Sequence, residues 1–232
     1  MQTLQSVLEN VSRDKKGIEI GGPSQSTGQL IYHNAFSMDN VIFSEETVWS
    51  NNTSTYNYYQ EKQGDVIICD AVNLSSVKND TYDFCFASHS LEHIANPIKA
   101  VKEWIRVIKP GGHVVLILPE KSVCFDHNRN ISSFTTLVDQ YNKNVGEDDL
   151  STLSEILENH DLTMDLAAGD FESFKQRSLQ NFNNRCLHHY VYNADLLKQI
   201  CEYCSCKFIY TITDGLNIWF IMRKGRTSKM IL

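Results

Sequence analysis

The residues of this sequence most able to do chemistry are five histidines, four of which lie next to a carboxylate or to another histidine. They are His89, His93, His127, His188 and His189. A histidine can act as a general base near neutral pH, and a carboxylate beside it orients its ring. Asp126 and His127 could therefore form a carboxylate-oriented base, with Arg129 binding a phosphate or carboxylate of a substrate. As an alternative, the cluster only fixes a lid by hydrogen bonds.

A metal site formed by Asp126, His127 and one of His188 or His189 is a further alternative, but we predict no metal ion here. If His188 and His189 lie in an extended segment, their side chains point to opposite faces, so only one of them faces a pocket. We take His188 as a catalytic candidate. We take His189, together with Arg185, as a candidate for substrate binding.

His89 follows an apolar run that is expected to form a strand. It would then stand at the edge where open α/β sheets bind their ligands, and we count it among the catalytic candidates. Its alternative role is to shape a cofactor pocket without moving a proton.

A glycine turn follows the first apolar strand pattern. It reads Glu19-Ile20-Gly21-Gly22-Pro23-Ser24 and lacks the G-x-G-x-x-G spacing that seats a dinucleotide pyrophosphate on a helix N-terminus. An acidic residue two positions before the first glycine suits a ligand end that carries an ammonium group. Bare glycine backbone lets such a ligand approach closely. The turn therefore favours a different ligand from a dinucleotide.

Apolar runs predict the elements that position these residues. Strands are expected at 17–20, at 35–43 with a break at Asp39 and Asn40, and at 65–69, 82–87 and 113–118. The polar stretch 50–63 is expected to be a loop. A helix should begin at Pro97 and end before Pro110-Gly111-Gly112. Strands that are apolar throughout, such as 65–69, are typical of a parallel sheet covered on both faces.

The segment 120–192 interrupts this alternation and is expected to be a helical, substrate-binding insertion. After it, Asn193 caps a helix, and the runs 207–213 and 216–222 around Asp214-Gly215 predict a hairpin. We therefore predict an α/β fold: a Rossmann-like, mostly parallel seven-stranded sheet with an antiparallel terminal hairpin and a helical insertion after the fifth strand. Residues 1–232 would form one domain, with a cofactor-binding core at 14–119 and the final helix and hairpin at 193–224.

Charge and composition argue against several classes of protein. A net charge of −7 opposes binding to a phosphate backbone, so we predict no nucleic-acid partner. The N-terminal residues do not follow a signal-peptide pattern and no apolar run is long enough to span a bilayer, so we expect no membrane partner and a cytoplasmic location. Seven irregularly spaced cysteines predict reduced thiols. The oligomeric state is left open.

Three stretches together resemble class I S-adenosylmethionine-dependent methyltransferases, in particular those of type 11. They are GIEIGGPS from Gly17, DVIICDAVNL from Asp65, and the block from Tyr82 to Pro119 that contains Glu92-His93. The resemblance implies S-adenosylmethionine as cofactor. It places the turn's two glycines, followed by Pro23 instead of the usual third glycine, under the cofactor's amino-acid part. Glu19 would lie near the ammonium group.

The resemblance also implies residues for the rest of the cofactor. Asp39, with Asn40 beside it, falls about where such folds place the acid that accepts from the ribose hydroxyls. Asp70 would accept from the adenine amino group, with Ala71 and Val72 lining the ring. The residues implied below the sulfonium are Ser88 and His89.

The strings 125–129, 146–149 and 184–189 resemble a little-characterised subgroup of bacterial and viral methyltransferases associated with glycan or polysaccharide modification. Because the insertion is also rich in histidines and acids that could bind polyols, we predict O-methylation of a sugar hydroxyl on a nucleotide sugar or glycan. N-methylation of a small amine is an alternative. Another is a non-catalytic binding protein with a vestigial cofactor fold.

Overall fold

The apolar runs of the sequence form one mixed sheet in the computed structural model, which describes residues 2–47 and 55–226. Within that part of the chain the sheet has eight strands in the order β3-β4-β2-β1-β5-β6-β8-β7. The parallel strands are β1 (Lys16–Ile20), β2 (Ser37–Ile42), β4 (Lys62–Ile68), β5 (Tyr82–Ser88) and β6 (Ile108–Pro119). The α/β fold and the mostly parallel sheet are confirmed.

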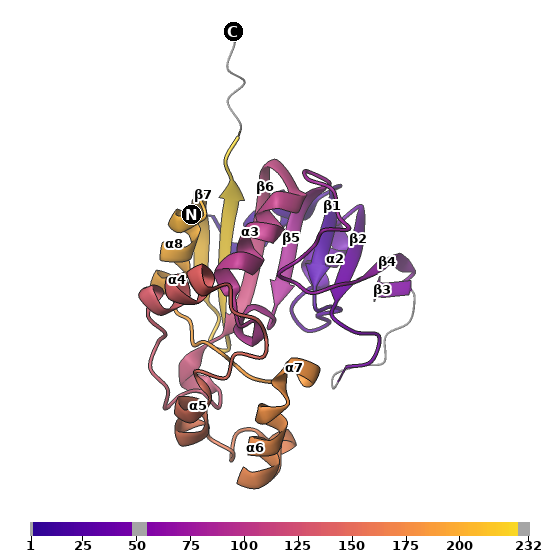
Figure 1. Ribbon diagram of the computed structural model, residues 1–232. Coiled ribbons are helices and arrows are strands. Elements are labelled where there is room, and N and C mark those ends of the chain that lie inside the picture. The colour runs from indigo at the N-terminus through magenta and orange to yellow at the C-terminus, as the bar shows by residue number, and fades with distance from the viewer. Residues whose placement is uncertain (1, 48–54, 227–232) are drawn as a thin grey trace.

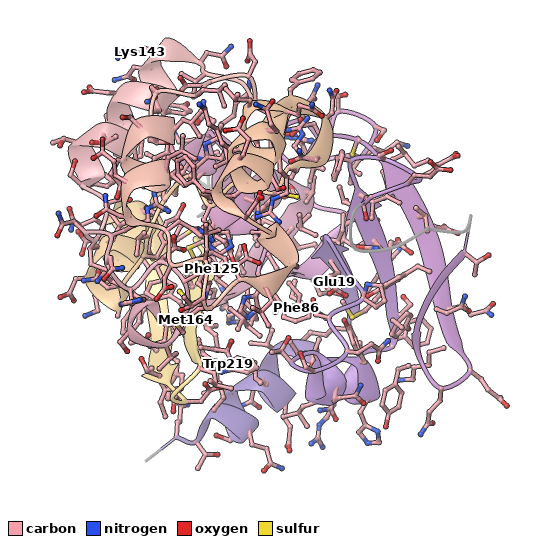
Figure 2. The ribbon with its side chains drawn as sticks, turned by 90° about the horizontal axis from the view of Figure 1, so that it is seen from below. Glu19, Phe86, Phe125, Lys143, Met164 and Trp219 are labelled. Carbon is pink, nitrogen blue, oxygen red and sulfur yellow. The ribbon has the colours of Figure 1, made fainter. Side chains whose placement is uncertain are left out.

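Helices cover both faces of this sheet (Figure 1). Helices α3 (Pro97–Val107), α4 (Phe134–Lys143) and α8 (Ala194–Tyr203) share one core, while α1 (Leu4–Ser12) and α2 (Gln29–Asn34) share the other. Alternate residues of β6 supply the two cores: Leu116 belongs to the core that contains Trp104 of α3, and Val115 belongs to the core that contains Tyr32 of α2. Figure 2 shows Phe86 of β5 toward the middle of the molecule and Lys143, the last residue of α4, at its edge.

The segment after β6 is mostly helical and its lower part extends beyond the sheet (Figure 1). Besides α4 it contains η2 (Lys121–Val123), α5 (Leu153–Asn159), η3 (Leu166–Ala168), α6 (Phe171–Leu179) and α7 (Asn181–Asn184). It has a small core of its own, made by Ile156, Ala168, Phe174 and Leu187. The insertion thus folds partly on itself and partly against the sheet.

The terminal hairpin agrees with the sequence pattern. Strand β7 (Cys206–Thr213) pairs antiparallel with β8 (Asn217–Lys224), and β8 pairs antiparallel with β6. The Asn193 side chain accepts a hydrogen bond from the backbone N–H of Leu196 and caps α8, as predicted. No helix in the described ranges has the length and apolar character that a membrane span requires.

Three predictions about strands are wrong. Strand β2 runs unbroken through Asp39 and Asn40. The expected loop 50–63 contains β3 (Thr55–Tyr59), whose Tyr56 and Tyr58 are buried between exposed polar residues, while residues 50–54 lie outside the described ranges. The hairpin of β3 and β4 makes the sheet eight-stranded and places β4 near its edge, where Ile68 is 52% exposed instead of buried.

Candidate active site

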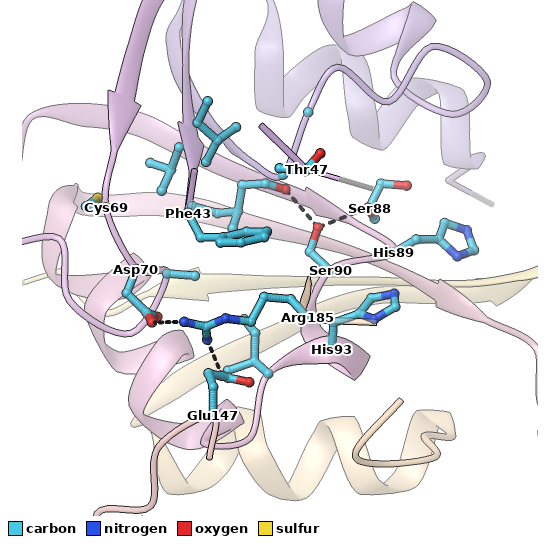
Figure 3. A pocket seen from close by; sticks show the side chains of 17 residues that line it. Phe43, Thr47, Cys69, Asp70, Ser88, His89, Ser90, His93, Glu147 and Arg185 are labelled. Carbon is cyan, nitrogen blue, oxygen red and sulfur yellow. Dashed lines mark hydrogen bonds and ion pairs between the residues drawn. The ribbon is translucent and has the colours of Figure 1, made fainter. Parts of the chain in front are cut away.

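A cavity of about 340 Å³ opens where β1, β2, β4 and β5 end. The chain crosses from strand to loop there, as in other open α/β sheets that bind ligands at this edge. Its walls come from the sheet edge, from the loop after β5 and from two residues of the insertion (Figure 3). The lining residues are Ile20, Gly21, Gly22, Val41, Ile42, Phe43, Thr47, Cys69, Asp70, Ala71, Ser88, His89, Ser90, His93, Ile94, Glu147 and Arg185.

The glycine turn forms one wall with bare backbone. Gly21 has a φ of +78°, a conformation that favours glycine, and a Cβ there would lie 2.7 Å from Ser90 Oγ. Asn40 holds the next residue from both sides, because its Oδ1 accepts from Gly22 N at 3.0 Å and its Nδ2 donates to Gly22 O at 2.8 Å. Asn40 therefore positions the turn and does not itself line the cavity. The following Pro23, after a cis peptide bond, is not a lining residue either.

Glu19 is fully buried and packs against Gly22 of the turn; Figure 2 shows it in the interior of the molecule. Its carboxylate accepts hydrogen bonds from the hydroxyls of Tyr32 and Tyr56 and from Ser24 N–H. A Cβ on Gly22 would come within 2.2 Å of the Glu19 carboxyl carbon, so glycine is needed for this packing. Burial raises the pKa of Glu19 despite these hydrogen bonds. Glu19 therefore supports the turn from below, and its predicted place near the ammonium group of the cofactor stays a prediction.

Asp39 also lies away from the cavity, in the interior of β2. Its carboxylate accepts hydrogen bonds from Asp65 N–H and the Tyr82 hydroxyl and pairs with Lys16 at 2.9 Å. The strand ends three positions later, so Ile42 and Phe43 reach the cavity instead. Asp39 thus lies away from the cavity where the ribose contact was predicted, and its oxygens already bind partners within the sheet.

Asp70 and Ala71 line the cavity at the end of β4, whereas Val72 does not. Asp70 Oδ2 accepts a hydrogen bond from Arg185 Nη2 at 3.2 Å, and Arg185 Nη1 lies 3.4 Å from Glu147 Oε1. The same guanidinium lies over the ring of Phe43, 5.3 Å from its centroid. Figure 3 shows Arg185 between Asp70 and Glu147, so a side chain of the insertion closes this end of the cavity.

Ser88 and His89 line the cavity at the end of β5. His89 has a φ of +49°, which turns its ring toward β8, where its Nε2 donates to Asn217 Oδ1 at 2.8 Å. Burial lowers the pKa of His89, but Glu92 and Asn217 raise it more, and the net shift is upward. His89 thus combines access to the cavity with a perturbed pKa.

Glu92, His93 and His188 form a cluster behind this wall. One possible ligand atom from each lies within 4.8 Å of the others. The rings of His93 and His188 meet edge to face with centroids 4.5 Å apart. Burial and the neighbouring His188 lower the pKa of His93 to about 3, so its ring is neutral at pH 7. Burial alone would raise the pKa of Glu92, but the three histidines around it lower it below its usual value.

Asp126 was predicted to pair with His127, but in the structure it pairs with His188. His188 Nδ1 donates to Asp126 Oδ2 at 2.6 Å, whereas His127 Nε2 donates to Asp161 Oδ2 at 2.8 Å. Burial would raise the pKa of Asp126, but His188 and Arg129 lower it to about 2. The sequence neighbour was the wrong partner because the chain turns at 124–129 and directs the two side chains apart.

Arg129 was predicted to bind an anionic group of the substrate. In the structure it is buried and has other partners. It donates to the carboxylates of Asp126 and Glu155 and to the backbone carbonyls of His188 and His189. These partners occupy all three guanidinium nitrogens. Arg129 therefore anchors the segment that carries the two histidines.

His189 is buried and is not a cavity-lining residue. Its Nε2 accepts a hydrogen bond from Asn181 Nδ2 at 3.0 Å, and its backbone N–H donates to Glu92 O at 2.8 Å. Burial lowers the pKa of His189 to about 4. Of the three predicted substrate-binding residues, Arg185 alone lines the cavity.

Comparison with known families decides the class of protein. Residues 38–116, from β2 into β6, match a family described as "Methyltransferase domain". The protein is an enzyme of the methyltransferase type. The matched region contains Asp70, Ser88 and His89 but not the glycine turn or the insertion. No curated protein matches the sequence.

Solved structures share the fold of this methyltransferase over nearly its whole length. An S-adenosylmethionine-dependent methyltransferase from Methanosarcina mazei has a TM-score of 0.55 at 16% identity, over 97% of this chain and 100% of that one. A putative S-adenosylmethionine-dependent methyltransferase from Listeria monocytogenes has a TM-score of 0.54 at 11% identity, over 95% and 97%. The fold is thus that of class I S-adenosylmethionine-dependent methyltransferases.

Sequence reasoning missed several residues of this methyltransferase's site. Phe43, Ser90 and Glu147 line the cavity, and the positioning role of Asn40 was not foreseen. The signal for Phe43 was available, because it follows directly on the last apolar residues of a strand. Glu147 carries no such signal, since its place depends on how the insertion folds back.

Proposed function

We propose that the protein transfers a methyl group from S-adenosylmethionine to a hydroxyl of a sugar, on a nucleotide sugar or a glycan. The observation that carries this proposal is the shared cavity: Gly21 and Gly22 line one wall, Asp70 another, and His89 a third. The cofactor supplies an electrophilic methyl group. The protein's own residues must then hold the two reactants in line, for which orientation contributes up to about 7–11 kcal/mol.

The cavity fits the cofactor by its chemistry. The backbone at Gly21, where a Cβ would fill the space beside Ser90, suits the amino-acid part, and the carboxylate of Asp70 suits the adenine amino group. Asp70 retains acceptor capacity beside its bond to Arg185, because a carboxylate offers about four lone-pair sites. Phe43 gives an apolar face for the adenine ring.

A hydroxyl acceptor must lose a proton, and His89 is the residue we assign to take it. It lies at the cavity wall, and because its Nε2 donates to Asn217, its Nδ1 is the nitrogen that would take the proton. Its raised pKa makes it a better base than an ordinary histidine once it is deprotonated. Glu147 and Arg185, an acceptor and a donor on the opposite wall, suit the paired hydroxyls of a sugar. These residues support a polyol better than a small amine, which needs no strong base.

The test is to incubate the protein with S-adenosylmethionine labelled in its methyl group and separate panels of nucleotide sugars, glycans and small amines. We expect label on a sugar hydroxyl, located by mass spectrometry and NMR. His89→Gln should cut kcat by about 10²–10⁴-fold while leaving cofactor affinity nearly unchanged. His33→Gln, at an exposed histidine, is the matched control. Label on amines alone, with a flat pH-rate profile, would contradict the proposal.

A further inference from the structure

A buried carboxylate without a hydrogen-bond partner lies next to the cavity. Glu92 is 1% exposed, and neither of its oxygens has a hydrogen-bond partner within residues 2–47 and 55–226. His89 Nδ1 lies 3.5 Å from Glu92 Oε1, beyond the usual length of such a bond. Burying an ionised carboxylate is costly unless a cation or donors compensate it. His89 compensates this carboxylate only from 3.5 Å and on one side, so the position of Glu92 favours a further cation.

Two imidazoles face the same place. The possible ligand atoms of Glu92, His93 and His188 lie within 4.8 Å of one another. His189 N–H donates to Glu92 O, which fixes the segment of His188 against the 3-10 helix η1 (Leu91–His93). Two histidines and one carboxylate are the ligand set of many catalytic zinc sites and of non-haem iron sites.

His188 is already oriented as a metal-binding histidine would be. Its Nδ1 donates to Asp126 Oδ2 at 2.6 Å, which leaves Nε2 with its lone pair directed away from that carboxylate. Asp126 is held in turn by Arg129. A carboxylate on the far nitrogen is the usual second partner of metal-bound histidine, because it fixes the tautomer and the ring plane.

From this geometry we propose that Glu92, His93 and His188 bind a divalent transition-metal ion of the Zn²⁺ class, with Asp126 orienting His188. Ligands at about 2.0–2.2 Å from one ion lie roughly 3–4 Å apart, so the three atoms must close by roughly 1 Å. The Glu92 carboxylate can make that movement because no hydrogen bond holds it. With three protein ligands, one position stays open, and His93 lies at the cavity wall.

The proposal is tested by titrating Co²⁺, a spectroscopic substitute for Zn²⁺, into the full chain after removal of metal with a chelator. We expect one Co²⁺ per chain with a visible d–d band and no thiolate charge-transfer band. Glu92→Gln and His188→Gln should abolish the band, and Asp126→Asn should weaken binding about 10–100-fold. His33→Gln, at an exposed histidine outside the cluster, should bind like the unaltered protein.

Other outcomes would overturn the site. They are the absence of a band in the unaltered protein, equal binding by the ligand variants, and a thiolate band, which would move the ion to the cysteines. X-ray absorption on the unaltered protein loaded with Zn²⁺ keeps the test valid if the variants fail to fold. Nitrogen and oxygen neighbours with scattering from two imidazoles support the site, and sulfur neighbours contradict it.

Discussion

The glycine turn after β1 and the segment 184–189 of the insertion reach the same cavity but are held in different ways. Asn40, from the adjacent strand, clamps the peptide groups of Gly22, so the turn belongs to the sheet. The insertion segment is held by Arg129, which donates to the carbonyls of His188 and His189 from 59 and 60 residues earlier in the chain. Asn40 holds its wall through neutral hydrogen bonds, whereas Arg129 holds the other through a network of buried charges.

This difference predicts how each wall fails. Removing one member of a buried charge network leaves its partners uncompensated and is strongly destabilising. Removing a neutral hydrogen-bonding side chain from a turn costs less and acts locally. Damage to the insertion should therefore reduce stability first, and damage to the turn should reduce cofactor binding first.

The largest effect is expected for Arg129→Met. The change leaves the buried Asp126 without its guanidinium partner, so we expect a loss of about 3–5 kcal/mol in the free energy of unfolding. Chemical denaturation measures the loss, and hydrogen exchange should locate the opening in residues 120–192. Arg177→Met removes a partly exposed pair with Asp165 and should cost at most about 1 kcal/mol. Equal losses in the two variants would remove the contrast between the walls.

Asn40→Ala should weaken cofactor binding without lowering the stability of the insertion. It removes both hydrogen bonds to Gly22, for which we expect about 1–3 kcal/mol, or roughly a 5- to 150-fold weaker Kd for S-adenosylmethionine. Isothermal titration calorimetry measures the affinity. Asn57→Ala, at an exposed position of β3, is the control and should leave the Kd unchanged. Unaltered binding in Asn40→Ala would mean that the turn does not carry the cofactor.

Asp70→Asn tests the contact between the sheet edge and the insertion segment. The amide keeps one acceptor oxygen and loses the charge that binds Arg185, so we expect S-adenosylmethionine to bind about 5- to 30-fold more weakly. Asp65→Asn, at an exposed position of β4, the strand that precedes Asp70, should bind S-adenosylmethionine normally. A double variant with Arg185→Gln shows whether the two losses add. If the two losses of affinity simply add, the Asp70–Arg185 contact does not contribute to cofactor binding.

The smallest effect is expected on β6 outside the cavity. Burial, with Lys15 and Arg223 nearby, lowers the pKa of His113 to about 4. Between pH 6.5 and 4 the unfolded chain therefore binds more protons than the folded one, so stability falls as the pH falls. The residue is only partly buried, and we expect about 1 kcal/mol from it. His113→Gln should reduce the loss of stability between pH 7 and pH 5, whereas His33→Gln should not.

The sheet-edge residues were predictable because strand ends are visible in the sequence. Asp70, Ser88 and His89 directly follow or close apolar runs, and all three line the cavity. Asp39 does not reach the cavity because the polar pair Asp39-Asn40, interpreted as a break, lies inside a strand that continues to Ile42. Strand β3 was hidden because polar residues alternate with its buried tyrosines.

Pairing inside the insertion was not predictable in the same way. Asp126 and His188 are 62 residues apart, and the histidine next to Asp126 in sequence turns to Asp161 instead. Such pairs depend on how short helices close around a small core, and no periodic pattern encodes that closure. The helical character of the segment could be inferred, but not its partners.

Arg185 bonds Asp70 with one nitrogen and approaches Glu147 with another, so a single side chain touches the wall assigned to the methyl donor and the wall assigned to the acceptor. A ligand that moves this guanidinium changes the binding surface, and so the affinity, for the other ligand. Thermodynamic linkage then requires the influence to be mutual: the factor by which the donor alters acceptor affinity equals the factor by which the acceptor alters donor affinity.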